Sequence, residues 1–248
     1  MIDPAKATEA AFFHTVIYQQ CLEDSFLLDT TDSSNPVKGG ASLREQAYAQ
    51  IKQRIITCQL RPGDAINEAQ LTQLLGLGRT PVHQALHRLE MEGMVTILPR
   101  KGVMVTAISL NDVLDMIDVR VCNEQLCVKL ALERAQESDF VAMRTILERS
   151  PALLKQRDVP GLMDVDLQFH LAISAAARNR VLADLLRNLH EKQARFWFLT
   201  MSEMHHSERI YEEHQQILDA MENRDSEAAI HAIHHHIDDF RRAIIRTL

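Results

Sequence analysis

The sequence lacks the features that mark membrane proteins and secreted, disulfide-bonded proteins. None of its apolar runs approaches the roughly 20 residues that a membrane-spanning helix needs. The opening residues, MIDPAKATEA, contain no basic stretch followed by an apolar core, so we expect no signal peptide. The 4 cysteines form no CxxC pair, which argues against a disulfide scaffold and against a cysteine-based zinc site. These absences predict a cytoplasmic protein without membrane contact.

Excess positive charge is also missing. The 248 residues carry 27 Lys and Arg against 34 Asp and Glu, a net charge of −7, which argues against a generally basic nucleic-acid binder. The charge is unevenly distributed, because residues 42–107 carry +3 while residues 1–41 and 108–248 carry −4 and −6. Of the three segments, the middle one alone has a charge that suits contacts to DNA phosphates.

Composition and periodicity divide the chain into three parts. Residues 1–41 form an N-terminal extension and linker, in which 1–30 has the spacing of an amphipathic helix and 29–40 is rich in Asp, Ser, Asn, Pro and Gly. That helix could pack on the body of the protein or on a partner subunit. We expect a winged helix-turn-helix over 42–107 and an all-α bundle of six to seven helices over 108–248, so the predicted fold is mainly α.

The middle segment begins with three helical patterns. Apolar spacing predicts helices over about 42–58 and 68–75, and a third helix opens with Arg79-Thr80-Pro81. Thr80 can cap this third helix, which puts Pro81 at its first position, where the missing N–H costs nothing. This order is typical of a helix-turn-helix, which places its last helix in the major groove of DNA.

A strand pair follows the third helix. Gly93 closes the helix, and residues 94–98 and 103–106 alternate as two strands. The turn between them contains Lys101 and Gly102, so the tip of this predicted wing is basic.

The middle segment resembles the N-terminal domain of the GntR family of bacterial transcription regulators. The resemblance covers nearly the whole segment and lies in the pattern Arg61-Pro62-Gly63, Leu71, Leu74, Leu77-Gly78-Arg79-Thr80-Pro81-Val82, Ala85-Leu86, Leu89 and Gly93-Met94-Val95. It implies DNA contacts by Arg79, Thr80 and Gly102. To these we add His83, at a position where the family often uses arginine, and the basic Lys101 of the wing.

The segment departs from the family pattern at four positions. The family usually has Ser at Gly78, Arg at Ala69 and His83, and Glu at Gln84. Because the two arginines often touch DNA in the family, we expect an operator different from the family's common one. The alternative is a winged helix used only for protein contacts, but the RTPV run at the start of the third helix favours DNA binding.

From Ser109 onward the apolar periodicity is helical and nearly unbroken. It predicts helices over about 109–135, 137–155, 159–177, 179–204, 207–222 and 226–246. Asp166 and His170 are four residues apart and share the inward face of one of them. His214 and His236 also face inward, eleven residues before and after Asp225. If the last two helices form an antiparallel hairpin centred there, both imidazoles lie at the same height.

Three imidazoles and one carboxylate on inward faces form a ligand set for a divalent metal. Zinc suits this set best, and nickel, manganese or iron are possible. The alternative is a group of core histidines satisfied by hydrogen bonds. A single inward histidine would favour that alternative, whereas four ligand-type residues that converge by independent spacing favour a metal.

The same residues resemble the FCD effector domain of the FadR-type subfamily. The resemblance spans about 109–245 and lies in Asp166-Leu167-Gln168-Phe169-His170, Asn179, Glu213-His214, Ile217, Ala220, Ala229 and His236. It implies that Asp166 and the three histidines ligate the metal. It also implies that Arg120 holds a carboxylate ligand near the metal and that Asn179 hydrogen-bonds nearby. For Arg120 an ion pair with Glu124, one turn further along the helix, is an equal alternative.

Together these patterns predict a metabolite-responsive, DNA-binding transcription regulator that acts as a repressor and is not an enzyme. We expect a homodimer on a pseudo-palindromic operator of double-stranded DNA. We expect a small organic or sugar acid as the effector, bound at the metal, with the signal passing through the helix at 109–135. The alternatives are a metal sensor whose effector is the metal itself and a metal-dependent hydrolase, although the sequence shows no general base such as that of an HExxH motif.

Overall fold

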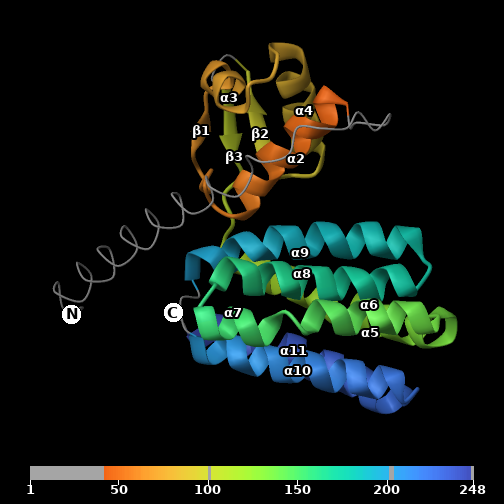
Figure 1. Ribbon diagram of the computed structural model, residues 1–248. Coiled ribbons are helices and arrows are strands. Elements are labelled where there is room, and N and C mark those ends of the chain that lie inside the picture. The colour runs from red at the N-terminus through yellow and green to blue at the C-terminus, as the bar shows by residue number, and fades with distance from the viewer. Residues whose placement is uncertain (1–41, 100–101, 201–203, 247–248) are drawn as a thin grey trace, which may run out of the picture. The chain divides into compact units, whose positions relative to one another are not determined.

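The computed structural model describes residues 42–99, 102–200 and 204–246. The predictions for residues 1–41 and for Lys101 lie outside these residues. The fold is mainly α, with a small sheet near its start, as predicted (Figure 1). None of the helices in the described part of the chain is both long and apolar enough to cross a membrane.

The elements follow one another with short connections. In chain order they are α2 (Leu43–Ile56), β1 (Ala65–Ile66), α3 (Glu68–Leu75), α4 (Arg79–Met91), β2 (Val95–Leu98), β3 (Gly102–Val105), α5 (Leu110–Arg134), α6 (Glu137–Leu147), α7 (Ser150–Gln156), α8 (Val159–Ala176), α9 (Arg180–Thr200), α10 (Met204–Glu222) and α11 (Ser226–Arg246).

The first three helices surround a core of their own. The Ser42 side chain accepts a hydrogen bond from the Glu45 N–H and thus caps α2, as its sequence predicts. Buried apolar side chains from α2, α3, α4 and the strands then pack together; they include Ile51, Ile55, Leu71, Val82, Leu86, Leu89 and Val103. This separate core is what a winged helix-turn-helix over 42–107 requires.

The start of α4 differs from the prediction. Thr80 does not cap the helix: α4 begins at Arg79, and its N-cap is Gly78, which has no side chain to offer. Pro81 is consequently the third helical residue and not the first. The shift costs no hydrogen bond, because the first turn of a helix has unpaired N–H groups in any case.

The wing forms as predicted, with one additional strand. β2 pairs antiparallel with β3, and Ile97 lies opposite Val103. At Gly93, φ is +73°, a conformation that glycine adopts without strain as the chain leaves α4. The additional strand, β1, was not predicted; it pairs with the other edge of β3 and gives the sheet order β1-β3-β2. A strand of two residues is too short to show a period.

Helices α5 to α11 form the predicted bundle around a second core (Figure 1). Ser109 caps α5 in a capping box with Asp112. The prediction of one helix over 137–155 is wrong, because the chain forms two helices, α6 and α7. Pro151 lies at the start of α7, where its missing N–H breaks no bond, whereas inside a continuous helix it would.

The last helices position the histidines. α10 starts at Met204, earlier than the predicted residue 207, and residues 201–203 lie outside the description. Asn223 to Asp225 form the turn into α11, and the two helices pack against each other along their length. The antiparallel hairpin therefore exists, and it brings His214 and His236 to the same level, with ring centroids 4.6 Å apart.

Candidate metal centre

Four predicted ligand residues meet inside the bundle. Asp166 and His170 come from α8, His214 from α10 and His236 from α11, and one ligand atom from each lies within 4.8 Å of the others. The Nε2 atoms of His170 and His236 are 3.2 Å apart. Asp166 Oδ1 lies 3.4 Å from His214 Nε2 and 3.8 Å from His170 Nε2. Three Nε2 atoms and one carboxylate oxygen thus face a common point.

These separations fit a small divalent cation. Four ligands at zinc's usual bond lengths, arranged as a tetrahedron, lie about 3.3 Å from one another. The three histidines are buried, and the Asp166 side chain is 25% exposed. Buried His214 Nε2 makes no formed hydrogen bond among the described residues, and its contact to Asp166 is a long one. A buried polar atom in this position calls for a partner.

Two buried carboxylates contact the Nδ1 atoms of two of these rings, on the side away from the common point. Glu124 Oε2 lies 2.8 Å from His170 Nδ1, and Glu213 Oε2 lies 2.8 Å from His236 Nδ1. A carboxylate acceptor favours the tautomer with the proton on Nδ1. When both carboxylates are ionised, the two Nε2 atoms present lone pairs to each other across 3.2 Å, an arrangement that a shared cation stabilises.

The electrostatics keep the ligand set in its metal-binding form. Burial would raise the pKa of Asp166, but the His214 contact and the neighbouring imidazoles hold it far below its usual range. Burial, followed by His214 and His170, lowers the pKa of His236 well below its ordinary value. The carboxylate is therefore ionised and this imidazole neutral, which are the states that coordinate metals.

Glu213 is balanced between its neighbours. Burial and Asp239 raise its pKa to about 8, while Arg209 lowers it. Because the pKa of His236 is lowered, the proton of the Glu213–His236 pair lies mainly on Glu213 near neutral pH when no cation is bound. A cation at His236 Nε2 requires the proton on Nδ1 and an ionised Glu213, so cation binding and the position of this proton are linked.

A second buried group is a poorer cation site. Glu124, His170 and His190 also lie close enough to share an ion. However, Arg120 Nε is 2.6 Å from Glu124 Oε1, and its positive charge already neutralises that carboxylate. Burial, followed by Arg120, lowers the pKa of His190 to about 4. The guanidinium occupies the place that a cation would need.

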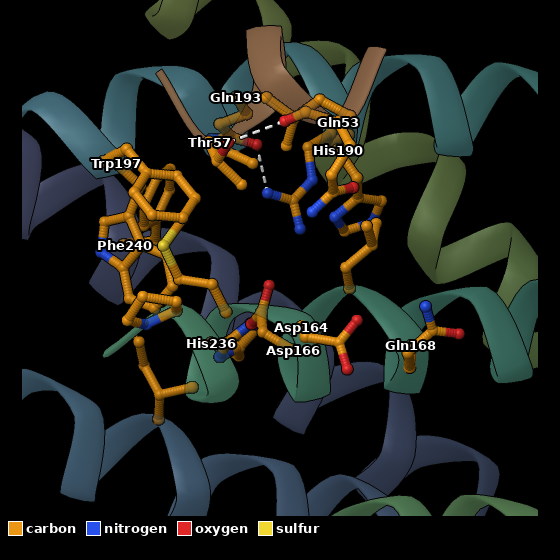
Figure 2. A pocket seen from close by; sticks show the side chains of 18 residues that line it. Gln53, Thr57, Asp164, Asp166, Gln168, His190, Gln193, Trp197, His236 and Phe240 are labelled. Atoms are coloured by element: carbon orange, nitrogen blue, oxygen red, sulfur yellow. Dashed lines mark hydrogen bonds between the residues drawn. The ribbon is translucent and has the colours of Figure 1, made fainter. Parts of the chain in front are cut away.

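A cavity of about 140 Å³ is lined by two of the four predicted ligands, Asp166 and His236. In Figure 2, His190 and Gln193 of α9 lie across it from Asp166 and His236. Its other walls are largely apolar; they include Met163, Trp197, Phe198, Ile210 and Phe240. Gln53, Ile56 and Thr57 of α2 also line it.

The position of Arg120 is compatible with both roles expected for it, the ion pair with Glu124 and the binding of a carboxylate ligand. It forms the predicted ion pair with Glu124 and also donates a hydrogen bond to Gln193. The side chain is only 5% exposed, and it lines the cavity. The ion pair holds the planar guanidinium in place beside the cavity without removing it from the wall.

Asn179 has a different position from the one the resemblance implies. Its side-chain oxygen accepts a hydrogen bond from the Leu182 N–H at 3.2 Å, and its carbonyl accepts one from Ala183. These are the bonds of a helix N-cap at the start of α9, and Asn179 is not among the cavity-lining residues. Asn179 therefore caps α9, and its role in effector binding stays a prediction.

Three residues of this region were not predicted: His190, Gln193 and Glu213. The first two lie three residues apart on α9, but Glu191, Lys192 and Arg195 beside them are polar as well, so no pattern singles them out. Glu213 is among the residues that carry the FCD resemblance, but the resemblance assigns it no role, and its contact with His236 follows only from how α10 and α11 meet.

The predicted DNA contacts lie on the surface of the first segment. Arg79, Thr80 and His83 are exposed on the first turns of α4. Gly102 is exposed at the start of β3, where φ is +93°, and Lys101 precedes it outside the described residues. Their surface position leaves the four described residues accessible to a duplex.

Comparison with known families accounts for both segments. The model of the bacterial regulatory proteins, gntR family, matches residues 43–105, and that of the FCD domain matches residues 115–239. The HTH-type transcriptional regulator YdhC of Bacillus subtilis (strain 168) is 28% identical over 185 residues, 74% of this chain and 83% of the relative. The HTH-type transcriptional repressor GlaR of Escherichia coli (strain K12) is 28% identical over 198 residues, 77% of this chain and 90% of the relative.

A solved structure shares the fold. The structure of E. coli McbR/YncC matches with a TM-score of 0.76 at 20% identity, over 84% of this chain and 99% of that one.

Proposed function

The chain belongs to the GntR family of bacterial transcription regulators and carries an FCD domain, so it is a regulator and not an enzyme; from this premise we propose a metal-dependent repressor that a small organic acid releases from DNA. Residues 42–107 are its DNA-binding domain and residues 108–248 its effector and dimerisation domain. The repressor GlaR offers a precedent for the direction of control.

The observation that carries the proposal is the convergence of four ligand atoms inside the bundle. Asp166, His170, His214 and His236 would hold a divalent cation, for which zinc is the first choice. The cation would supply a Lewis-acidic position to which an acid's carboxylate oxygen can bind. The two outer carboxylates, Glu124 and Glu213, orient the rings for this purpose.

The adjoining cavity favours a metabolite over the metal as the effector. A sensor of the metal alone needs only the four ligands, whereas this site opens into about 140 Å³ of space. Arg120 lies on its wall, and a guanidinium binds a carboxylate in two-point fashion. The apolar wall that contains Trp197 and Phe240 would pack against the carbon skeleton of the acid.

Helix α9 offers a route from the cavity to the DNA-binding domain. His190 and Gln193 face the cavity, while Glu191 Oε2 lies 2.6 Å from Lys52 Nζ of α2. Arg195, also on α9, donates a hydrogen bond to the carbonyl of Thr106. A ligand that binds two positions of α9 unequally would shift these contacts. This route runs beside the predicted one through α5.

The DNA-binding surface comprises Arg79, Thr80 and His83 on α4 together with Lys101 and Gly102 of the wing. One such surface reads a half-site, so a homodimer would read a pseudo-palindromic operator. Because the family's usual arginine is a histidine at position 83, the half-site should differ from the family's common one.

The test is a thermal-shift screen of carboxylic and sugar acids, run with and without a chelator. We expect a subset of acids to raise the melting temperature and the chelator to abolish their effect. A duplex selected from a random-sequence library then reports DNA binding by fluorescence anisotropy, and the same acids should release it. Stabilisation by no acid, combined with no effect of the chelator, would contradict the proposal.

Titration of zinc into the DNA-binding assay without acid tests the metal-sensor alternative. A repressor that responds to an acid should bind DNA equally well at all zinc concentrations that fill its buried site. A full on–off response to metal alone, lost in Asp166→Ala, would establish the sensor instead.

A further inference from the structure

A second pair of histidines lies on the exposed face of α4. His83 and His87 are one helical turn apart, and their Nε2 atoms are 3.1 Å from each other. The rings stand at 89°, with centroids 4.6 Å apart. The two side chains are 53% and 51% exposed, so solvent reaches the point on which both Nε2 atoms converge.

A carboxylate lies on the outer side of each ring. Glu68 Oε2 of α3 is 3.4 Å from His83 Nδ1, and Glu90 Oε2 is 3.5 Å from His87 Nδ1. Both carboxylates favour a proton on the adjacent Nδ1. Since a neutral imidazole carries one ring proton, both Nε2 atoms then present lone pairs to each other.

A simple hydrogen bond between the rings does not satisfy this arrangement. If one neutral ring donates from Nε2, its Nδ1 carries no proton and turns a lone pair toward a carboxylate. A cation between the two Nε2 atoms allows all four groups to keep favourable partners. The separation of 3.1 Å corresponds to an angle of about 100° at a metal with zinc's bond length to nitrogen.

We propose that His83 and His87 form a surface site for a divalent transition metal of the zinc, copper or nickel class. Imidazole nitrogens select these ions over magnesium and calcium, which prefer oxygen. Glu68 and Glu90 hold the rings from outside, and solvent completes the coordination. The site is distinct from the buried centre, because its residues come from α3 and α4 alone.

The consequence for DNA binding rests on the proposed function of α4 as the DNA-reading helix. A His83 ring turned toward His87 and held by a metal is withdrawn from base edges in the major groove. The coordinated solvent would also occupy the space between the helix and the duplex. Metal binding at this pair should therefore weaken operator binding, independently of any acid.

Metal stoichiometry tests the site itself. We would count bound zinc per chain by equilibrium dialysis and elemental analysis, with copper(II) as a second probe. The wild type should bind two equivalents and His87→Ala one. The matched control is His231→Ala, since His231 and His235 are also one turn apart but their stacked rings are 6.5 Å apart and do not converge. Equal zinc content in His87→Ala and the wild type would overturn the site.

The buried centre can be removed to isolate the surface site. In Asp166→Ala/His214→Ala we expect one equivalent, lost on adding His87→Ala. If the double variant fails to fold, the wild-type comparison with His87→Ala still decides the matter.

Anisotropy with the selected duplex tests the consequence. Zinc should weaken DNA binding of the wild type severalfold and leave His87→Ala unaffected. A pH-dependent loss of DNA binding that needs His87 but no metal would replace the metal with a shared proton and overturn the proposal. Failure to select any duplex would contradict the proposed function while leaving the stoichiometry as an independent result.

Discussion

The buried centre and the α4 pair use the same arrangement of side chains in different surroundings. In each, imidazole Nε2 atoms converge while carboxylates face Nδ1 from outside. In the bundle the carboxylates are 2.8 Å from Nδ1, and on α4 they are 3.4 Å and 3.5 Å away. Burial removes competing water, so electrostatic interactions are strong in the first region and weak in the second.

This difference assigns different roles to the two regions. The buried centre has three imidazoles and one carboxylate, and its polar groups must be satisfied for the bundle to be stable. The exposed pair has two imidazoles in contact with solvent, so its interactions are screened and add little to stability. We therefore expect the buried centre to contribute to stability and the surface pair to contribute to DNA binding alone.

The largest expected contrast is between a buried ion pair and an exposed one. Arg120→Ala leaves Glu124 buried without its partner, which should destabilise the protein by about 3–5 kcal/mol. Arg180→Ala removes an exposed pair with Asp184 and should cost at most about 1 kcal/mol. Urea unfolding of both variants measures the difference.

Arg120→Lys keeps the charge and separates stability from effector binding. It should restore much of the stability but not the response to acids, since lysine lacks the planar fork. Full acid response in Arg120→Lys would restrict Arg120 to its ion pair with Glu124.

Removal of a metal ligand should have the next-largest effect on stability. His214→Ala should lose the buried metal, and with it the stabilisation of about 2.7 kcal/mol that a ligand provides at one hundred times its Kd. For a chain of this length that corresponds to roughly 5–10 °C in melting temperature. A chelator should lower the wild-type melting temperature by a similar amount and have no effect on His214→Ala.

His87→Ala is the control from the other region. Its melting temperature should respond to the chelator as the wild type does, because the surface pair adds little to stability. A large chelator effect that disappears in His87→Ala would reverse the roles assigned to the two regions.

These contrasts also show which parts of the site the sequence could predict. The convergence of the four predicted ligands followed from local patterns: Asp166 and His170 share a helical face, and His214 and His236 are equidistant from the turn at Asp225. Helical periodicity and one hairpin turn carry this information.

The remaining parts depend on contacts between elements. Glu124 and Glu213 reach their histidines across helix interfaces, and the sequence does not show which acid will face which ring. The exact start of a helix is also hard to predict: Gly78, not Thr80, is the N-cap of α4, and Asn179 caps α9, a backbone role that a family pattern does not reveal.

The stability of the protein should depend on pH through the buried histidine His190. Burial and Arg120 lower the pKa of His190 to about 4 from an ordinary 6.5. The unfolded chain therefore binds more protons than the folded one between these values. The contribution of His190 to stability is complete above pH 6.5 and is lost as pH falls toward 4, by at most about 3 kcal/mol.

Urea unfolding at pH 7 and pH 5, with a chelator present throughout, measures this loss. His190→Gln should flatten the pH dependence, whereas His231→Gln, on the exposed face of α11, should leave it unchanged. An identical slope in all three proteins would show that the charge state of His190 does not differ between the folded and unfolded states.

Substitution of Glu213, the carboxylate beside His236 Nδ1, should have a smaller but measurable effect on metal affinity. Glu213→Gln leaves all four ligands in place but weakens the acceptor that orients His236. Loss of such a partner usually lowers metal affinity by about 10–100-fold. Zinc titration of the buried site, with the α4 pair removed by His87→Ala, measures the affinity. Glu212→Gln, at the exposed neighbouring position, should leave it unchanged.

The smallest effect should come from the corresponding carboxylate on α4. Glu68→Gln removes the acceptor at 3.4 Å from His83 Nδ1, but solvent screens that contact and can replace it. An interaction worth at most about 1 kcal/mol changes affinity by no more than about fivefold. Zinc binding to the α4 pair in an Asp166→Ala/His214→Ala background should therefore weaken by a factor within that range. Glu68→Gln could instead weaken zinc binding to the α4 pair as strongly as Glu213→Gln weakens zinc binding to the buried site. In that case burial would not explain the difference between the two regions, and the geometry that they share would set their zinc affinities.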